Sequence, residues 1–466
     1  MRKNVIVYGK VENSVQKKAV EILSRILHDY SFEYPVCCKY DETLTFDNPR
    51  LFYIGTAENN PYTARGFDFE LTDPEGYAIK VQNDCVYIQG YDDIGVVYGC
   101  IDFYNKYILK YEFPDDAQVF RVNLFENELA DFEYTSCPSV KNRGIWTWGH
   151  VIYDYRGFFD NMLMLKMNTV IIWNDFAPIN AKEMLDYAHS CGIKVIWGYP
   201  WLWDTDCSVA LKDGLRYNPR DFLEKYEKEY GDAGGDGIYV QSFTELNVDS
   251  VNGIVIADAV ADFVNETSEL FFEKYPDIEL QFGLHATSVK DRLECIEKVN
   301  PKIRIVWEDC GAFPFSYLPS DLEEFENTKE FAEKIAVLRG ENDRFGVVTK
   351  GFTKLDWTKF EHPEGAALIG AASDYVKENR IIRKSRIWKY LQAHWLVNAD
   401  KAYEMIQQMC KKKQGDLYIT ALVEDGMFEE NLMYPVALYS EMLWDTDADL
   451  KRMISEVAMR DYVTFA

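Results

Sequence analysis

The sequence has an excess of acidic residues and very few histidines. It carries 50 lysine and arginine residues against 77 aspartate and glutamate residues, for a formal net charge of −27, and has 6 histidines. The longest basic run is Lys411-Lys412-Lys413, which reads as a solvated helix end. A broad, sequence-independent grip on nucleic acid is therefore excluded, because phosphate groups would be repelled.

Long apolar runs and metal motifs are also lacking. No stretch approaches the ~18 apolar residues of a membrane span, and the run Val5–Tyr8 is too short for a signal peptide. The ten cysteines form no Cys-x-x-Cys pair and share no spacing with histidines, which argues against a zinc or redox site. No Gly-x-Gly-x-x-Gly loop follows an early strand. We therefore expect a cytoplasmic protein with reduced thiols that uses no metal, cofactor or membrane.

Aromatic residues, in contrast, are abundant. They make up 15% of the chain, and eight of the eleven tryptophans fall between residues 146 and 357. Such a distribution is typical of proteins that stack rings against sugars, although a large core could also hold them.

The first part of the chain predicts a small α+β domain, residues 1–125. A strand at Val5–Tyr8 precedes a helix with apolar residues at helical spacing, and two strands, Tyr77–Val81 and Cys85–Gln89, flank a turn-forming Gln82-Asn83-Asp84. The segment 130–141 contains turn formers and no apolar periodicity, and we place the domain boundary there.

The second part predicts a (β/α)₈ barrel over residues 140–375, because short apolar strands alternate with longer helical segments. An open doubly wound sheet is the alternative. A helical region, residues 376–466, is expected to follow. The eight strands are expected at Gly144–Trp148, Thr169–Trp173, Lys194–Tyr199, Gly237–Phe243, Glu279–Leu284, Arg304–Trp307, Phe345–Thr349 and Ala367–Gly370.

Active sites of such barrels lie at the carboxyl ends of the strands, so the residues just past each strand are the candidates. Cleavage of a glycosidic bond needs two carboxyl groups, one of which protonates the leaving oxygen. Glu245 follows strand four, and Glu308 and Asp309 follow strand six, across the barrel. The candidates for sugar binding at the same end are Trp148, His150, Asn174, Tyr199, His285, Lys350 and Trp357.

Several segments resemble a known superfamily. Pro74-Glu75-Gly76-Tyr77, Val86-Tyr87-Ile88-Gln89-Gly90 and Gly95-Val96-Val97-Tyr98-Gly99 resemble the small domain that precedes the barrel in β-N-acetylhexosaminidases and α-glucuronidases. Asn142-Arg143-Gly144-Ile145 and Leu165-Lys166-Met167-Asn168-Thr169 are similar to the first βα unit of those barrels. The segment Tyr439-Ser440-Glu441-Met442-Leu443-Trp444 is similar to glucuronidase extensions.

The resemblance implies roles for particular residues. Arg143 matches an arginine that grips sugar hydroxyls, and Glu245 matches the general acid. Thr244 departs from the hexosaminidase pattern, which has an aspartate there to orient the substrate acetamide. The glucuronidase pattern uses carboxylates from later strands, which Glu308 or Asp309 could mimic.

The leading hypothesis is a glycoside hydrolase that removes a terminal sugar from short oligosaccharides, most simply an N-acetylhexosaminide. Two alternatives stay open: an α-glucuronidase-like hydrolase, and a non-catalytic sugar-binding protein on the same scaffold. An isomerase or lyase is a further rival, for which Lys350 is the one nominated Schiff-base lysine. The expected partner is an oligosaccharide, and a homodimer stays open.

Overall fold

The computed structural model describes residues 2–42, 45–109, 125, 128–174, 176–200, 218–241, 248–285, 289–308, 312–316, 324–341, 343–353, 365–371, 373–412, 416–423 and 432–466. The chain divides into two compact units. The first comprises Met1–Pro138 with His189–Gly192 and Ile454–Asp461, and the second comprises Ser139–Ala188, Ile193–Met453 and Tyr462–Ala466.

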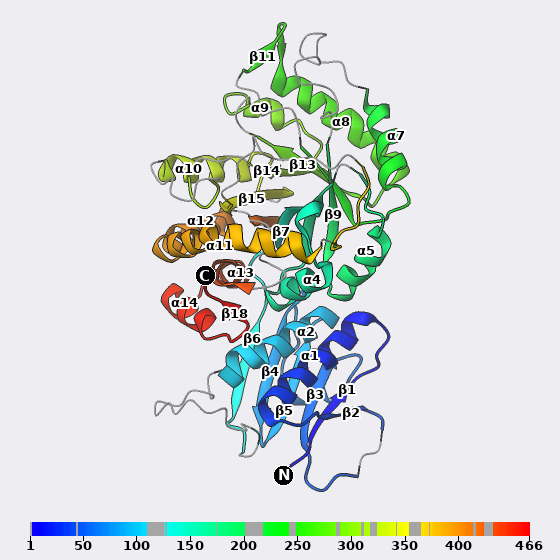
Figure 1. The fold of residues 1–466 in the computed structure, drawn as a ribbon, viewed down its shortest axis with the longest axis vertical. Helices are drawn as coiled ribbons and strands as arrows, with labels where there is room; N and C mark the ends of the chain where they lie inside the picture. Colours follow the sequence, from blue (N-terminus) through cyan, green and yellow to red (C-terminus); the bar gives the residue numbers. More distant parts are fainter. Residues whose placement is uncertain are drawn as a thin grey trace. The chain divides into compact units, whose positions relative to one another are not determined.

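The first unit is built on a six-stranded sheet in the order β2-β1-β3-β5-β4-β6. Strands β2, β1, β3 and β5 are parallel, whereas β4 is antiparallel to both of its neighbours. Helices α1 and α2 lie side by side against the sheet (Figure 1). The elements are β1 (Asn4–Tyr8), α1 (Ser14–Ser31), β2 (Val36–Lys39), β3 (Arg50–Thr56), η1 (Thr63–Gly66), β4 (Tyr77–Gln82), β5 (Cys85–Gly90), α2 (Asp93–Asp102), the π-helical η2 (Phe103–Ile108) and β6 (Phe132–Ser136).

Local sequence explains how these elements begin and turn. Helix α1 starts at a capping box, in which the Asn13 side chain accepts a hydrogen bond from the Gln16 N–H and the Gln16 side chain accepts one from the Asn13 N–H. The β4–β5 hairpin turns at Asn83 and Asp84, both of which have positive φ, at 50° and 63°. Asn and Asp tolerate this left-handed region better than other non-glycine residues, so the predicted hairpin is confirmed.

The second unit is a closed barrel of eight parallel strands surrounded by helices (Figure 1), so the predicted (β/α)₈ fold is confirmed. Its strands, in ring order, are β10 (Gly237–Gln241), β13 (Glu279–Leu284), β14 (Arg304–Trp307), β15 (Phe345–Phe352), β16 (Leu417–Val423), β7 (Asn142–Trp148), β8 (Thr169–Trp173) and β9 (Lys194–Pro200).

The helices that follow β6 in the chain lie mostly between these strands, and the last of them, α14, belongs largely to the first unit. They are η3 (Gly149–Val151), α4 (Tyr155–Met164), α5 (Ala181–Ser190), α7 (Pro219–Tyr230), α8 (Ile256–Lys274), α9 (Leu293–Ile296), α10 (Phe325–Ala336), α11 (Asp374–Val397), α12 (Ala399–Lys412), α13 (Tyr434–Trp444) and α14 (Leu450–Ala458). Two short strand pairs complete the fold: β11 (Ser250–Val251) with β12 (Ile254–Val255), and β17 (Leu432–Met433) with β18 (Val463–Thr464).

The eighth strand differs from the prediction. Ala367–Gly370 is not a strand, and it ends at Gly370, whose φ is +73°. Leu417–Val423 closes the barrel instead, and all seven of its residues are buried. A continuous apolar run is typical of a parallel strand that is covered on both faces. The barrel therefore extends into the region expected to be helical, and the predicted boundary at residue 375 is too early.

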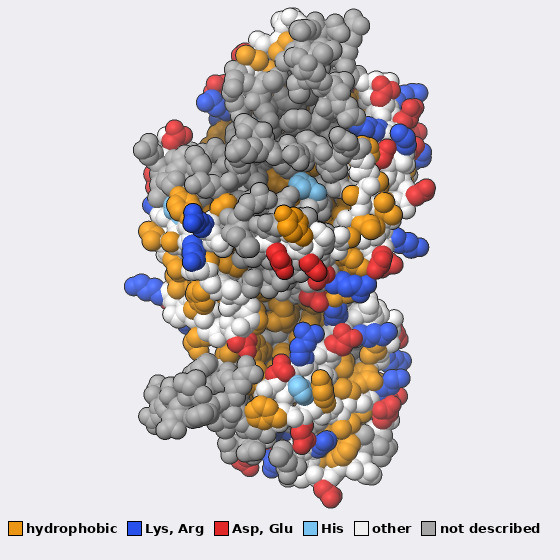
Figure 2. Space-filling model, in the orientation of Figure 1, with side chains coloured by type: hydrophobic (Ala, Val, Ile, Leu, Met, Phe, Trp, Pro, Cys, Tyr) orange, Lys and Arg blue, Asp and Glu red, His pale blue; other side chains and the backbone are white. Residues whose placement is uncertain are grey.

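Aromatic and aliphatic side chains fill the barrel, as small barrels require. The buried cluster comprises Trp146, Trp148, Val151, Ile171, Trp173, Ile196, Tyr239, Val306, Val348, Tyr418 and Leu422. On the face shown in Figure 2, acidic and basic side chains are interspersed over the described surface. No helix within the described ranges is long and apolar enough to cross a membrane.

Candidate active site at the carboxyl ends of the barrel strands

Glu308 lies at the carboxyl end of β14 and is almost fully buried, with 3% of its surface exposed. Its N–H donates to the Leu284 carbonyl at 3.0 Å, which continues the pairing of β14 with β13 for one residue. Val306, two residues earlier, belongs to the core that fills the barrel. Because alternate residues of a strand share a face, Glu308 is directed to the same interior side.

Two nitrogen-bearing side chains from the neighbouring strands contact the Glu308 carboxyl group. The His285 Nε2 atom lies 3.3 Å from Glu308 Oε2, and the Lys350 Nζ atom lies 3.5 Å from the same oxygen. His285 directly follows β13 and Lys350 belongs to β15, so β13, β14 and β15 each contribute one group. His285 is 7% exposed and Lys350 is 2% exposed. The structure thus brings together three of the predicted residues.

Burial decides the charge state of the histidine. Desolvation lowers the pKa of His285 well below its ordinary value, and the positive charge of Lys350 lowers it further. His285 is therefore a neutral imidazole near pH 7, so its contact with Glu308 is not an ion pair. The positive charge beside Glu308 comes from Lys350, and an ammonium group at this distance favours the ionised carboxylate.

A glycine makes room for the carboxylate. A Cβ atom on Gly283 would lie 2.4 Å from Glu308 Oε1 and 2.4 Å from the Tyr239 hydroxyl oxygen, so no larger residue fits without displacing them. Tyr239 belongs to β10, the strand on the other side of β13. Neither Gly283 nor Tyr239 was predicted as a site residue. The signal available was the glycine within an otherwise apolar strand, which often marks a close approach of another group.

Three aromatic residues inside the barrel pack against one another and carry polar atoms, namely two indole N–H groups and a phenol hydroxyl. Trp146, Trp173 and Tyr239 contact one another with ring centroids 5.9 to 6.3 Å apart. Within the described part of the chain, neither indole N–H nor the Tyr239 hydroxyl has a hydrogen-bond partner, although all three atoms are buried. A buried donor without a partner costs about 1–3 kcal/mol, so these groups are suited to bind a hydroxyl-bearing ligand.

The predicted residues of β7 and β8 lie at the same end of the barrel. Trp148 is the last residue of β7 and packs edge-on against Trp146, with centroids 4.8 Å apart. His150 follows in the short helix η3. Asn174 directly follows β8 and is 6% exposed, and its side-chain amide donates to the Phe176 carbonyl at 2.9 Å. Asn174 therefore helps to shape the loop after β8.

Arg143 is not brought to this end. It is the second residue of β7, at the amino end of the strand, and is 1% exposed. Its guanidinium donates to the backbone carbonyls of Val140, Lys141 and Lys166 at 2.7 to 3.1 Å. It also lies 5.1 Å from the centroid of the Trp444 ring. These contacts hold together the amino ends of the strands, which differs from the sugar-gripping role expected for Arg143.

Four predicted residues cannot be placed in this way. Glu245, Asp309 and Trp357 lie outside the described residues, and for Tyr199 the backbone of β9 is described but the side chain is not. Among the described histidines, cysteines and acidic residues, no group of three or more could hold a metal ion.

Comparisons place this fold among those of known carbohydrate-active enzymes. No family model matches the chain, and no curated protein matches it in sequence. A mutant β-hexosaminidase from Streptomyces plicatus, solved with its product GlcNAc, superposes with a TM-score of 0.57 at 11% identity, covering 100% of this chain and 92% of that one. The GH20 β-N-acetylhexosaminidase from Streptomyces coelicolor gives 0.55 at 9% identity, covering 100% and 94%.

A GH115 4-O-methyl-α-glucuronidase gives a TM-score of 0.54 at 13% identity and covers 98% of this chain. The chain spans only 59% of that enzyme, and 52% of a GH138 enzyme that targets pectin rhamnogalacturonan II. At such low identities the similarity establishes the fold. The structural neighbours are glycoside hydrolases of several families, in agreement with the resemblance drawn from the sequence.

Proposed function

We propose that the protein is a glycoside hydrolase in which Glu308 is one of the two working carboxyl groups. The observation that carries the proposal is a buried carboxylate at the carboxyl end of a barrel strand, contacted by His285 and Lys350. Its neighbours inside the barrel include aromatic residues with unengaged polar atoms. The known glycosidases that share the fold support the same reading.

The surroundings of Glu308 suit the carboxylate that works in its ionised form. Lys350 stabilises the negative charge, and the neutral His285 can donate a hydrogen bond from Nε2 to Glu308 Oε2. An ionised carboxylate can activate water, attack the anomeric carbon or stabilise an oxocarbenium-like transition state. We assign Glu308 this role, and we assign the protonation of the leaving oxygen to Glu245.

The assignment of Glu245 as the acid rests on the resemblance to known glycosidases and on its place in the chain. Glu245 lies four residues beyond Gln241, the last residue of β10, and β10 is separated from β14 by β13 alone. The carboxyl ends of β10 and β14 are therefore near each other in the ring. This suits the two carboxyl groups of a working glycosidase, which lie about 5–10 Å apart. Asp309, the other candidate from the sequence, is the alternative second carboxylate.

A terminal N-acetylhexosaminide of a short oligosaccharide is the proposed substrate. To bind the carboxylate of a uronic acid, the site would need a cationic side chain that is not already paired with another group of the protein. Lys350 is paired with Glu308, and Arg143 is engaged by backbone carbonyls at the other end of its strand. Neither of these two described cations is therefore free to bind a carboxylate of the substrate, which favours an uncharged sugar.

A panel of nitrophenyl glycosides tests the proposal. It should include the N-acetylglucosaminide, the N-acetylgalactosaminide, the glucuronide and neutral hexosides. Replacing Glu308→Gln or Glu245→Gln should lower kcat by about 10²- to 10⁴-fold, as expected for a lost acid or base. Glu297→Gln, at an exposed position on the barrel unit, is the control that should retain full activity.

Binding separates the hydrolase from a sugar-binding protein. The Glu308→Gln variant should still bind the preferred N-acetylated sugar, as measured by calorimetry. Full activity in that variant would remove Glu308 from the mechanism. A parent protein that binds these sugars and cleaves none of them would overturn the hydrolase assignment.

A further inference from the structure

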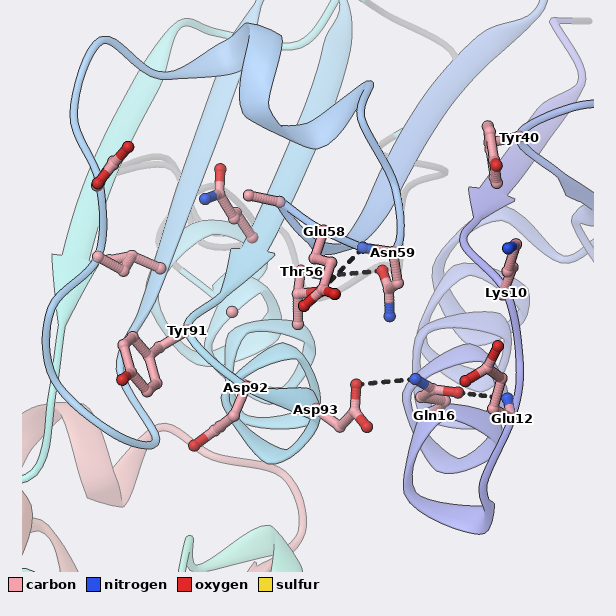
Figure 3. Close-up of a pocket in the computed structure, with 15 residues that line it drawn as sticks. Lys10, Glu12, Gln16, Tyr40, Thr56, Glu58, Asn59, Tyr91, Asp92 and Asp93 are labelled. Atoms are coloured by element: carbon pink, nitrogen blue, oxygen red, sulfur yellow. Dashed lines mark hydrogen bonds between the residues drawn. The ribbon is translucent and has the colours of Figure 1, made fainter.

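The small α+β unit contains a pocket of its own, which the proposed hydrolase site does not use. Its volume is about 700 Å³, within the range of small-molecule sites. It opens at the carboxyl ends of the parallel strands, since its lining residues follow β1, β2, β3 and β5 (Figure 3). In the sheet, β1 lies between β2 and β3, so the connections that leave β1 and β3 run to opposite sides. Ligands of open parallel sheets bind at the carboxyl ends of the strands where the strand order reverses in this way.

The charged residues of the lining are mostly acidic. They include five carboxylate residues against one lysine: Glu12, Glu58, Glu70, Asp92 and Asp93, with Lys10. Figure 3 shows Glu58 between the segment of Lys10 and Glu12 on one side and the segment of Tyr91 on the other. An anionic ligand would be repelled by this lining.

Two of these carboxylates, Asp92 and Asp93, already accept hydrogen bonds at the N-termini of α1 and α2. Asp92 accepts hydrogen bonds from the N–H groups of Gly95 at 2.8 Å and Glu75 at 3.0 Å, and so caps α2. Asp93 accepts from the side chains of Asn13 and Gln16 at 2.7 and 2.9 Å. In nucleotide-binding sheets the free N–H groups at helix N-termini bind phosphate. Here the N-termini of α1 and α2 are capped by the side chains of Asn13 and Asp92. A nucleotide is therefore a poor candidate.

The remaining carboxylates are available to a ligand. Among the described residues, Glu12, Glu58 and Glu70 form no ion pair. No three of the described acidic residues are close enough to hold a metal ion, so the charges are spread over a site larger than a cation. Opposite charge favours a ligand that carries a protonated amine.

A second observation points to a ligand with hydroxyl groups. Gln89, the penultimate residue of β5, lines the pocket and is 6% exposed, and its Oε1 atom has no hydrogen-bond partner within the described chain. A buried acceptor of this kind is satisfied by a donor such as a hydroxyl or an ammonium group. Tyr40 and Tyr91 also line the pocket, and their rings can pack against the face of a sugar.

We propose that this pocket binds an amino sugar with a free ammonium group, as a single unit or as the end of a short oligosaccharide. The carboxylates of Glu12, Glu58 and Glu70 would receive the ammonium and hydroxyl groups, and Gln89 would accept a further hydroxyl. The inference does not depend on the hydrolase activity, because the two sites lie in different compact units.

Calorimetry on the full chain tests the inference with three probes: glucosamine oligomers of two or three units, their N-acetylated counterparts and cellobiose. At the site that the substitutions below remove, the glucosamine oligomers should bind at least tenfold more tightly than the other two. N-acetylated oligomers that bind in the barrel are recognised because those substitutions leave their binding unchanged. The double substitution Glu12→Gln and Glu58→Gln should weaken that binding at least tenfold. Glu21→Gln, at an exposed position of α1 outside the pocket, is the matched control and should bind as the parent does.

Three outcomes would overturn the inference. They are the absence of binding at millimolar glucosamine oligomer, an equal loss of N-acetylated or neutral sugar binding in the double variant, and unchanged glucosamine oligomer binding in that variant. Both substituted glutamates are exposed, so the variants should fold, and unfolding midpoints equal to that of the parent would verify this. Binding that disappears in Glu308→Gln but not in the double variant would locate the ligand in the barrel instead.

Discussion

At the scale of single residues, the proposed chemistry depends on which group balances the negative charge of the Glu308 carboxylate. Its carboxylate is buried, and the one described ammonium group that contacts it belongs to Lys350. Burial alone would favour the protonated acid, whereas the ammonium favours the carboxylate. The pair therefore sets the charge state at which the proposed reaction runs.

Replacing Lys350→Met tests this balance. Without the ammonium group, Glu308 is harder to ionise, so the acidic limb of the kcat/KM profile should move to higher pH. The free energy of unfolding at pH 7 should fall by about 3–5 kcal/mol, because the substitution removes one partner of a buried ion pair. Lys334→Met, on the exposed side of α10, should change neither property. An unmoved pH profile would show that Lys350 does not control the working carboxylate.

His285 predicts a pH dependence of stability. Its pKa is lowered in the folded protein, so below about pH 6.5 the unfolded chain binds more protons than the folded one. Stability is then greatest above pH 6.5 and falls as the pH is lowered, by up to about 1.4 kcal/mol per pH unit from this group. Burial lowers the pKa of His394 as well, which adds to the trend in the same direction.

Urea denaturation between pH 5.5 and 7.5 measures this dependence. The slope of unfolding free energy against pH should be shallower in His285→Gln than in the parent. Parallel curves for the two proteins would contradict the assignment of a neutral, buried His285.

At the scale of elements, ion pairs tie together the amino ends of four neighbouring barrel strands. Arg304 of β14 contacts the carboxylates of Glu279 and Asp416 at 2.7 and 2.6 Å, and it is 2% exposed. Arg344, just before β15, contacts the same two carboxylates, but its side chain is 37% exposed. The two arginines differ mainly in burial.

This difference predicts unequal effects of the same substitution. Arg304→Leu should lower the unfolding free energy by about 1.5–3 kcal/mol, because it removes charge-assisted hydrogen bonds from a buried guanidinium to Glu279 and Asp416. Arg344→Leu should cost about 1 kcal/mol or less, since solvent screens its charge. Chemical denaturation of both variants measures the effects, and equal losses would show that burial does not set the strength of these pairs.

At the scale of the whole molecule, the net charge of −27 is the dominant property. Like charges repel one another across a folded chain, and dissolved salt screens this repulsion. The thermal midpoint should therefore rise by a few degrees when NaCl is increased from about 10 to 200 mM. A midpoint that falls over this range would show that attractive ion pairs, such as those of Arg304, outweigh the repulsion.

The sequence by itself determined the local elements and the fold class. Seven of the barrel strands, the β4–β5 hairpin and α1 were predictable, because apolar periodicity, turn residues and caps act over a few neighbouring residues. It also indicated that Glu308, His285 and Lys350 lie at strand ends. The strand Leu417–Val423 was missed, because its apolar run follows two long helices and was assigned to a helical tail.

The tertiary structure alone decided which side chains meet. Glu308, His285 and Lys350 are separated by more than twenty residues in sequence and come together because β13, β14 and β15 are neighbours in the ring. Tyr239 joins them through the space left by Gly283, and Arg143 is held at the opposite end by backbone carbonyls. Contacts of this kind depend on strand register and barrel closure, which are properties of the whole sheet and not of any short segment.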